Sequence, residues 1–331
     1  MSAVASTTAP ARDVATWLRA HRRLLLITHV RPDGDAFGSV VGLLSGLTSA
    51  GFDCQGFLGT PLPDRYRDIF PRLPGLLESK PPDLTAVDAV VCLDTANWQR
   101  ADLPPGLARD TSLPVCNIDH HPDNTGFGHE HWIAPDRTAT AQMLTELLDV
   151  MGVPVAEATA TPLFTGLVTD CGGFRFRNTN AGALRTAADL MERGAAYSAI
   201  MNNLFFREPY SKLLLKAHLL ENARFAHDNR LLYTVLDEDA LEQYGVQPAD
   251  TENIIDTLRV VDSVDIACLI QPEEGQVRFS FRARSEQARV DRIAHELGGG
   301  GHPLAAGARV ENISVNEAER LLVRVTERTL S

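Results

Sequence analysis

Four short polar segments in the first half of the sequence carry residue types that bind divalent metals. In chain order they are His29 with Asp33 and Asp35, then Asp94, then Asp119 with His120 and His121, and finally Asp170. Imidazoles and carboxylates without thiolates suit Mn²⁺ before Zn²⁺. Several carboxylates predict more than one ion, because like charges so close together repel unless they are neutralised. Two such ions would clamp a phosphate and generate a nucleophile from water at neutral pH.

The spacing within the first segment has a geometric use. One tight loop could face one ion with His29 and Asp33 and a second ion with Asp35. A single aspartate after an apolar run is more often a turn or cap residue, so Asp94 or Asp170 alone carries little weight. The joint occurrence of all four segments in this order favours a metal site.

Each polar segment ends an apolar run, and these runs alternate with helical patterns. The runs are Leu24 to His29, Val87 to Leu93, Val115 to Ile118 and Thr161 to Thr169. Helices are predicted over 13–23, 35–50 and 139–151, with Thr138 as the N-cap of the last. This alternation predicts an α/β fold with a doubly wound parallel sheet. Ligands of such sheets bind beyond the carboxyl ends of strands, so we expect the four segments to converge.

The pattern changes in the second half of the chain, and the change predicts a smaller α/β domain. Helices are expected over 181–195 and 209–226, with a short helical stretch between them. The runs 231–236, 265–270 and 276–282 are typical of strands, and 239–244, 251–261, 290–297 and 316–330 are typical of helices. The expected organisation is a catalytic domain over 1–190, a helical connector over 191–228 and a substrate-binding domain over 229–331.

A glycine run and an arginine mark a candidate anion site in the second domain. Gly299, Gly300 and Gly301 precede His302, and backbone N–H groups of such a run can approach an anion closely. Arg282 ends a predicted strand, and its planar fork suits phosphate. A flexible surface loop and a surface charge pair are the alternative interpretations.

Composition and charge limit the kinds of binding partner and the cellular compartment that we expect for this protein. The 331 residues carry a formal net charge of -12, which argues against a long nucleic-acid track but not against a small anionic substrate. No apolar run approaches the ~20 residues that span a bilayer, so no membrane association is expected. The segment Met1 to Arg12 lacks the apolar stretch of a secretory signal. Five cysteines without a Cys-x-x-Cys pair predict buried thiols and a reducing cytoplasm.

These motifs resemble the DHH phosphoesterase superfamily, and the tail GGGGHPLAAG resembles its DHH-associated C-terminal domain. The resemblance covers residues 15 to 325. It implies a first manganese ion on His29, Asp33 and Asp94. It implies a second on Asp35, Asp94, His120 and Asp170, with Mg²⁺ or Co²⁺ as substitutes. Asp94, Asp119, His120 and His121 would form the catalytic set, with Asp119 and His121 mainly orienting ligands. Arg282, Gly299, Gly300, Gly301 and His302 would grip the substrate in a cleft between the two domains of a homodimer subunit.

The length of the chain and the type of its C-terminal domain indicate which branch of that superfamily it resembles. The sequence lacks the basic Ser-Arg-Lys-Lys motif of family II pyrophosphatases, the extra nucleic-acid-binding domain of RecJ exonucleases and the membrane regions of membrane-bound cyclic-dinucleotide phosphodiesterases. The resemblance therefore implies the nanoRNase/pAp phosphatase branch. Members hydrolyse short RNA or DNA oligonucleotides to mononucleotides, and 3'-phosphoadenosine-5'-phosphate (pAp) to AMP. A RecJ-like exonuclease, a cyclic di-AMP or pApA phosphodiesterase and a non-catalytic nucleotide-binding module remain open.

Overall fold

The computed structural model of the chain describes residues 9–251 and 253–330. It divides into two units, Met1–Arg207 and Glu208–Ser331. Residues 1–8, where the absence of a secretory signal was expected, lie outside the described ranges. Among the described helices, none combines the length and the apolar character needed to cross a membrane.

A parallel sheet of six strands forms the centre of the first unit. Its strands are β1 (Arg23–Ile27), β2 (Asp53–Phe57), β3 (Leu76–Leu77), β4 (Ala89–Leu93), β5 (Val115–Asp119) and β6 (Glu130–Ile133). Their order is β3-β2-β1-β4-β5-β6, and every neighbouring pair is parallel. This confirms the predicted α/β class. The strand order reverses between β1 and β4, which is where doubly wound sheets bind their ligands.

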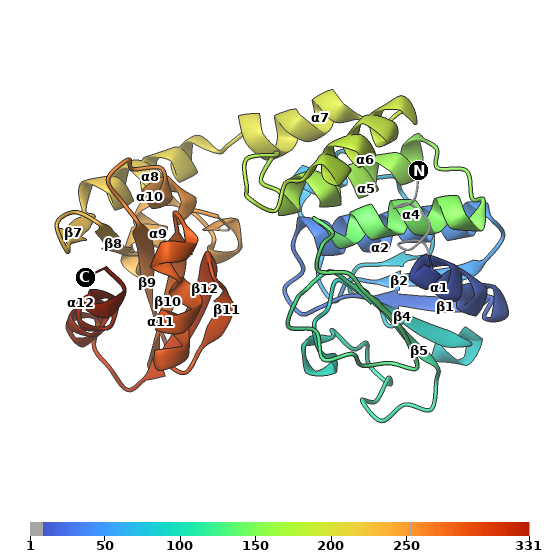
Figure 1. The fold of residues 1–331 in the computed structure, drawn as a ribbon, viewed down its shortest axis with the longest axis horizontal. Helices are drawn as coiled ribbons and strands as arrows, with labels where there is room; N and C mark the ends of the chain where they lie inside the picture. Colours follow the sequence, from blue (N-terminus) through green and yellow to red (C-terminus); the bar gives the residue numbers. More distant parts are fainter. Residues whose placement is uncertain (1–8, 252, 331) are drawn as a thin grey trace. The chain divides into compact units, whose positions relative to one another are not determined.

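The two faces of this sheet are covered differently. Figure 1 shows the longer helices stacked on one face; they are α1 (Ala9–Ala20), α2 (Gly34–Ser49), α4 (Thr140–Met151), α5 (Glu157–Asp170) and α6 (Ala181–Glu192). Leu24 and Leu26 of β1 pack into the core beneath these helices. Leu25 and Ile27 point the other way, into a smaller core beside two short 3₁₀ helices, Leu84–Ala86 and Trp98–Arg100. Short helices α3 (Asp64–Arg67) and α7 (Tyr197–Met201), with a π-helical turn at Asn202–Phe206, complete the unit.

A row of glycines lets α2 and α5 approach closely. Gly34, Gly38 and Gly42 recur every fourth residue and therefore share one face of α2. A Cβ on Gly38 would lie 2.4 Å from the carbonyl oxygen of Pro162 and 2.7 Å from the backbone nitrogen of Gly166. Since both of these atoms belong to the backbone of α5, the two helices pack nearly backbone to backbone. This contact brings the start of α2 beside the end of α5.

Replacing Gly38 with alanine is therefore expected to lower the free energy of unfolding by about 1–3 kcal/mol, because α5 cannot yield to the added methyl group. Gly46→Ala is the matched control in the same helix. There the added Cβ meets the tip of the Leu148 side chain at 3.0 Å, which can move. Urea unfolding of both variants tests this, and equal stability of the two would contradict the packing argument.

Two predictions for this unit are wrong. The run 161–169, expected as a strand, lies within helix α5, which ends at Asp170 and contains Pro162. Packing against α2 outweighs the β-branched composition of this run. Thr138 is not the N-cap of α4; the cap position is Ala139, and its side chain makes no capping hydrogen bond.

A second sheet organises the smaller unit. Its strands are β7 (Arg224–Ala226), β8 (Leu231–Val235), β9 (Ile266–Glu273), β10 (Gln276–Ala283), β11 (Gly300–His302) and β12 (Ala305–Glu311). The order is β11-β12-β10-β9-β8-β7, and only β8 and β9 are parallel. This confirms the predicted smaller α/β domain.

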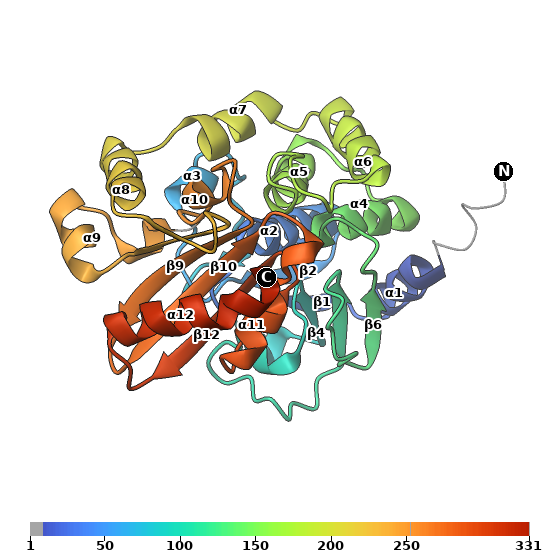
Figure 2. The same cartoon turned by 60° about the vertical axis from the view of Figure 1, so that its left-hand side comes forward.

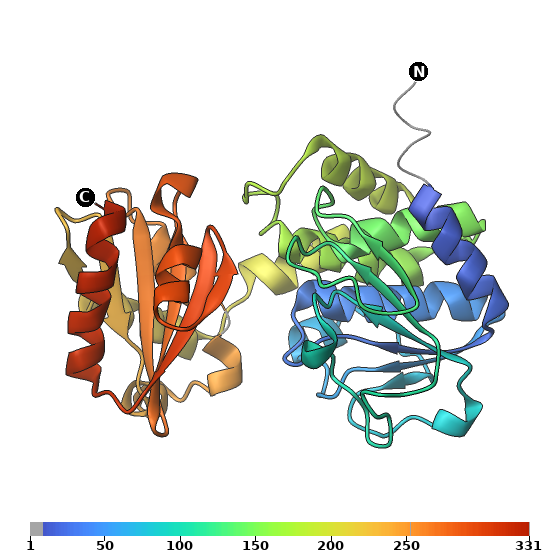
Figure 3. The same cartoon turned by 60° about the horizontal axis from the view of Figure 1, so that its bottom comes forward.

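Helices cover both faces of the second sheet. On one face lie α11 (Val290–Glu296) and α12 (Val315–Leu330), the latter running along the strands (Figures 2 and 3). On the other lie α8 (Tyr210–Glu221), α9 (Glu238–Tyr244) and α10 (Asp256–Arg259), which pack on β8 and β9. Short 3₁₀ turns at Pro248–Thr251 and Glu286–Ala288 complete the unit.

Three details of the second half differ from prediction. The helix expected over 209–226 ends at Glu221, and β7 follows it. The helix expected over 251–261, where residue 252 lies outside the described ranges, is reduced to the single turn α10. The glycine run is not a flexible loop, because Gly300 and Gly301 pair with β12 as part of an edge strand.

Candidate functional site

The loop after β1 brings three candidate ligands to the point where the strand order reverses. Asp33 caps α2: its Oδ1 accepts hydrogen bonds from the backbone N–H groups of Asp35 at 3.0 Å and Ala36 at 3.1 Å. Nδ1 of His29 lies 3.0 Å from the carbonyl oxygen of Val30, so His29 presents Nε2 toward Asp94.

Asp94 follows β4 and is the residue that the other segments share. Its backbone is left-handed, with φ of 54°, an uncommon conformation that is enriched for aspartate and at functional sites. The side chain is buried, with 2% exposed. Its carboxylate lies 3.7 Å from Nε2 of His29, 3.5 Å from Nε2 of His120 and 3.7 Å from Nδ1 of His121. All three distances leave room for an ion in place of a direct hydrogen bond.

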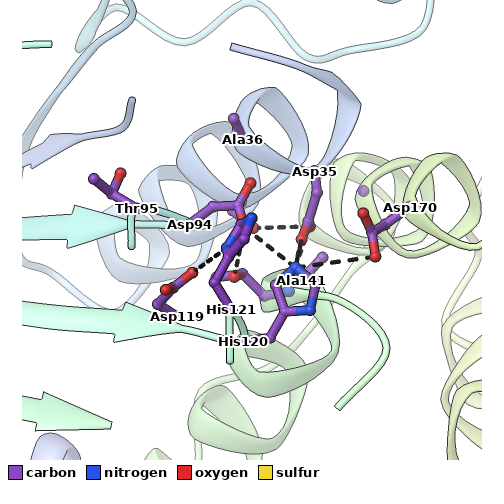
Figure 4. A network of polar contacts seen from close by, with 12 residues as sticks. Asp35, Ala36, Asp94, Thr95, Asp119, His120, His121, Ala141 and Asp170 are labelled. Atoms are coloured by element: carbon purple, nitrogen blue, oxygen red, sulfur yellow. Dashed lines mark hydrogen bonds and ion pairs between the residues drawn. The ribbon is translucent and has the colours of Figure 1, made fainter. Parts of the chain in front are cut away.

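The segment after β5 supplies two imidazoles with different roles. His120 points Nε2 into the cluster, 4.0 Å from Asp35 and 3.9 Å from Asp170. His121 instead pairs with Asp119, whose Oδ1 lies 2.7 Å from Nδ1 of His121. Figure 4 shows these side chains pointing toward one another from β4, β5, α2 and α5. His120 therefore points into the cluster, and Asp119 holds the ring of His121.

Asp35 and Asp170 enter the cluster from the two helices that the glycine row brings together. Asp35 begins α2 and is 1% exposed, whereas Asp170 ends α5 with a quarter of its side chain exposed. Burial, followed by the charges of Asp94, Asp170 and Asp33, raises the pKa of Asp35 well above its usual value. Burial and the charges of Asp33 and Asp94 raise the pKa of Asp170 to about 7, although His120 opposes this. The cluster thus holds several carboxylates close together, and a bound cation would relieve their mutual repulsion.

The neighbouring imidazoles act in the opposite direction on Asp94. Burial alone would raise the pKa of Asp94, but His29 and the charges of His121 and His120 lower it below its usual value. Burial would lower the pKa of His121, but the bond to Asp119 and the charge of Asp94 raise it to about 10. Asp94 is accordingly ionised, as a metal ligand must be.

Two groups of ligand atoms within the described ranges have the dimensions of a metal site. One combines His29, Asp33 and Asp94, and the other combines Asp94, His120 and His121. Within each group the ligand atoms lie within 4.8 Å of one another, and Asp94 belongs to both. Oxygen and nitrogen donors without thiolates fit a borderline-hard divalent ion. The residues present therefore fit two ions with a shared carboxylate.

Three polar neighbours of the cluster were missed from the sequence. The Thr140 hydroxyl donates to Asp94 at 3.0 Å, Asn178 donates to Asp170 at 3.0 Å and Asn124 donates to Asp119 at 2.6 Å. Asn124 and Asn178 lie in loops, and Thr140 begins a helix. Their short polar side chains carry no pattern that separates them from ordinary turn and helix-start residues.

The second unit carries its candidate residues on one face of its sheet. Side chains of β10 alternate, so Arg282 lies opposite the buried Phe281 and on the α10 side. Strand pairing places Arg282, Ala305 and His302 in one row across β10, β12 and β11. Adjacent strands lie about 4.8 Å apart, so the backbones of Arg282 and His302 are roughly 10 Å apart on the same face. Two long side chains at this separation can reach one phosphate group.

Arg282 lies among both acidic and basic side chains on this face. Burial lowers the pKa of Arg282, and the charges of Arg259 and Arg278 lower it further against the opposing effect of Asp256. Nε of Arg282 lies 3.6 Å from Oδ1 of Asp256, too far for a hydrogen bond. The guanidinium thus has an ion-pair partner in Asp256, and its Nη1 donates to the carbonyl oxygen of Phe281 at 3.1 Å.

The glycines of β11 have two different uses. A Cβ on Gly299 would lie 2.1 Å from the carbonyl oxygen of Gly307, and one on Gly301 would lie 2.7 Å from that of Ala305. These two positions let the edge strand approach β12. A Cβ on Gly300 would meet nothing within 4 Å, so this backbone faces open space where a ligand could approach. Of Gly299, Gly300 and Gly301, Gly300 is the one where an added Cβ would meet no neighbour.

Family models match both units of the chain. The model of the DHH family, N-terminal domain, matches residues 23–167, and the model of the DHHA1 domain matches residues 228–330. The bifunctional oligoribonuclease and PAP phosphatase NrnA of Thermus thermophilus is 35% identical over 305 residues, covering 92% of this chain and 89% of the relative. The chain belongs to the DHH family. It is therefore a hydrolase, and the resemblance inferred from the motifs is confirmed.

Solved structures agree on the DHH fold. An exopolyphosphatase-related protein from Bacteroides fragilis aligns with a TM-score of 0.88 at 22% identity, over 98% of this chain and 97% of that one. RecJ from Thermus thermophilus, solved in complex with Mn²⁺, aligns with a TM-score of 0.56 at 14% identity, over 97% of this chain and 55% of RecJ. At these identities the likeness establishes the fold.

Proposed function

We propose that this DHH protein is a two-manganese phosphoesterase that hydrolyses short oligonucleotides to mononucleotides and pAp to AMP. The observation that carries the proposal is the sharing of Asp94 between two metal-sized ligand groups. The name of the Thermus relative, an oligoribonuclease and PAP phosphatase, supports the substrate class. The net charge of -12 supports small substrates over long strands.

The first ligand set matches a group in the structure, whereas the second comes from the resemblance, because the corresponding group in the structure joins Asp94 and His120 with His121. His29, Asp33 and Asp94 would hold one ion, and Asp35, Asp94, His120 and Asp170 the other. Bound manganese would activate water and neutralise charge on the phosphate. Mg²⁺ or Co²⁺ would serve as substitutes.

The remaining residues of the cluster would act on protons. Asp119 holds Nδ1 of His121 at 2.7 Å, which fixes the ring and keeps the imidazole protonated. A protonated His121 beside the phosphate would donate its proton to the leaving oxygen. Asp119 would thus orient the donor and stabilise its charge.

The face of the second sheet would bind the terminal phosphate. Arg282 and His302 share a row across three strands, and Gly300 exposes its backbone beside them. Gly299 and Gly301 would shape this site through the close approach of β11 to β12. A substrate held by its terminus in this way would favour short ligands.

Arg282→Ala is expected to raise KM for pAp about 10–100-fold while changing kcat less, because charge-assisted hydrogen bonds contribute about 1.5–3 kcal/mol. Steady-state kinetics with pAp and with a dinucleotide measures the separate changes in KM and kcat. Arg224→Ala is the matched control: it removes the same charge from β7, at the opposite edge of the sheet, where Arg224 pairs with Glu319. An unchanged KM in Arg282→Ala would remove this residue from the substrate site.

One experiment tests the proposed function. Product formation is followed from pAp, a 5'-labelled dinucleotide and a labelled 20-mer single strand, each with Mn²⁺ and with EDTA. Metal-dependent turnover confined to the two small substrates supports the proposal. Strong turnover of the 20-mer would favour a RecJ-like exonuclease, and no turnover of any would favour a cyclic di-AMP phosphodiesterase or a binding module.

We also propose that the protein acts as a homodimer in the cytoplasm. Large apolar side chains are exposed on α6, at Leu184 and Met191, where a second subunit could cover them. All five cysteines are free and buried, which suits a reducing compartment. Light scattering of the purified protein tests the dimer, and a monomeric mass would exclude it.

A further inference from the structure

The first turn of α4 touches two of the candidate metal ligands directly. The backbone N–H of Thr140 donates to Oδ2 of Asp35 at 2.6 Å, and that of Ala141 donates to Oδ1 of Asp35 at 3.0 Å. The Thr140 hydroxyl donates to Oδ1 of Asp94 at 3.0 Å. Asp35 thus caps a helix that is remote in sequence, and Thr140 connects it to Asp94.

Thr138, two residues before this turn, connects to a third candidate ligand through one intermediate residue. The Thr138 hydroxyl donates to the carbonyl oxygen of Asn178 at 2.7 Å. The Asn178 side-chain amide donates to Oδ2 of Asp170 at 3.0 Å and to the Asp170 carbonyl oxygen at 3.1 Å. The side chain of Gln142 in turn accepts from the backbone N–H of Thr138 at 2.9 Å. The segment from Thr138 to Ala141 therefore connects ligands from α2, the end of β4 and the end of α5.

We propose that Thr140 is a positioning residue for the metal cluster, acting through its hydroxyl on Asp94, with Thr138 acting on Asp170 through Asn178. The inference rests on the proposed metal centre and assigns the residues that aim its ligands. A carboxylate with one oxygen fixed by a donor presents the other in a set direction, and such outer partners commonly tune metal affinity. The amino end of α4 also stabilises the negative charge of Asp35.

Because Thr140 is buried, a substitution there can remove the hydroxyl without changing the surface of the protein. Thr140 is fully buried at 0% exposed, and its hydroxyl lies among the ligands. A valine in its place would keep the shape but remove the donor to a shared carboxylate. Thr145 offers the contrast: it is buried in the same helix, and its hydroxyl donates only to the backbone oxygen of Ala141, at 2.9 Å.

The test compares Thr140→Val, Thr140→Ser and the control Thr145→Val in the full-length protein. Mn²⁺ binding is measured directly by calorimetry and by the electron paramagnetic resonance of free Mn²⁺. Thr140→Val is expected to weaken Mn²⁺ binding about 10–100-fold. Thr140→Ser should restore it, and Thr145→Val should bind as the wild type does. With dinucleotide, kcat of Thr140→Val should recover as Mn²⁺ is raised while KM stays constant.

The possible outcomes distinguish a failure of this inference from a failure of the proposed metal-dependent function. Wild-type Mn²⁺ affinity in a folded Thr140→Val variant would overturn the inference, whereas no Mn²⁺ binding by the wild type would overturn the metal centre itself. If Thr140→Val does not fold by circular dichroism, Asn178→Ala carries the test through Asp170. Asn178 is exposed, so its loss should leave the fold intact and weaken Mn²⁺ binding, and unchanged binding there would again overturn the proposal.

Discussion

Asp94→Asn is expected to reduce kcat at least about 10³-fold at saturating substrate and Mn²⁺. Asp94 lies in both candidate ligand groups, so the loss of its charge affects both ions. Electrostatic stabilisation by metal ions contributes several kcal/mol, and about 4 kcal/mol corresponds to 10³-fold. Asparagine preserves the size of the side chain and tolerates the left-handed backbone at this position. The loss is therefore chemical, and single-turnover hydrolysis of the dinucleotide measures it.

Asp88→Asn provides the control on the same strand. Asp88 precedes β4 and Asp94 follows it, but the Asp88 carboxylate pairs with Arg23 in part-exposed surroundings. The same substitution there should leave kcat unchanged. Near-normal turnover in Asp94→Asn with correctly folded protein would sink the assignment of the shared ligand.

Removing divalent ions with EDTA is expected to lower the Tm of the first unit by roughly 5–10 °C. A ligand at 100 times its Kd stabilises a fold by about 2.7 kcal/mol, and each kcal/mol shifts a unit of this size by about 2–4 °C. The crowded carboxylates around Asp94 explain the direction, because the cation relieves their repulsion. Differential scanning calorimetry with EDTA and with added Mn²⁺ measures the shift.

Protons should compete with Mn²⁺ for the carboxylates, so the Tm shift should depend on pH. Burial and neighbouring carboxylates raise the pKa of Asp170 to about 7, so Mn²⁺ affinity should fall as the pH drops below that value. The Tm of Asp94→Asn should respond little to Mn²⁺ at any pH. A full shift in that variant would place the bound ion elsewhere in the protein.

Much of the candidate metal site could be predicted because its polar residues lie in short segments at the ends of strands. The loop from His29 to Asp35 follows a buried apolar run, and Asp94 follows another. Parallel strands carry such segments to one edge of the sheet, so convergence follows from topology alone. Local sequence was sufficient wherever a ligand lies within a few residues of its strand.

Asp170 shows where local reasoning fails. The run before it is rich in threonine, which favours a strand, yet it forms α5 because Gly38 and its neighbours on α2 allow the two helices to pack closely. That contact joins residues more than a hundred positions apart. Thr140 was missed for a related reason: its importance comes from the carboxylates that surround it, and a threonine at a helix start is unremarkable by itself.

The glycine run illustrates a third limit. From the sequence it could be a flexible loop or an anion site, and the pairing of β11 with β12 shows why the first alternative fails. Gly299 and Gly301 let one strand approach another, whereas an added Cβ on Gly300 would meet no neighbour, which leaves its backbone open to a ligand. Identical residues side by side thus have unequal tolerance to substitution, which composition cannot reveal.

The order of these residues along the chain has a consequence for how the enzyme can diversify. Every candidate metal ligand lies between His29 and Asp170, in the unit that ends at Arg207, and every candidate phosphate-binding residue lies between Arg282 and His302, in the unit that begins at Glu208. Under the proposed function, hydrolysis and substrate choice therefore depend on residues of different units. Substitutions in the second unit would then change which nucleotide binds while the metal ligands of the first unit stay the same.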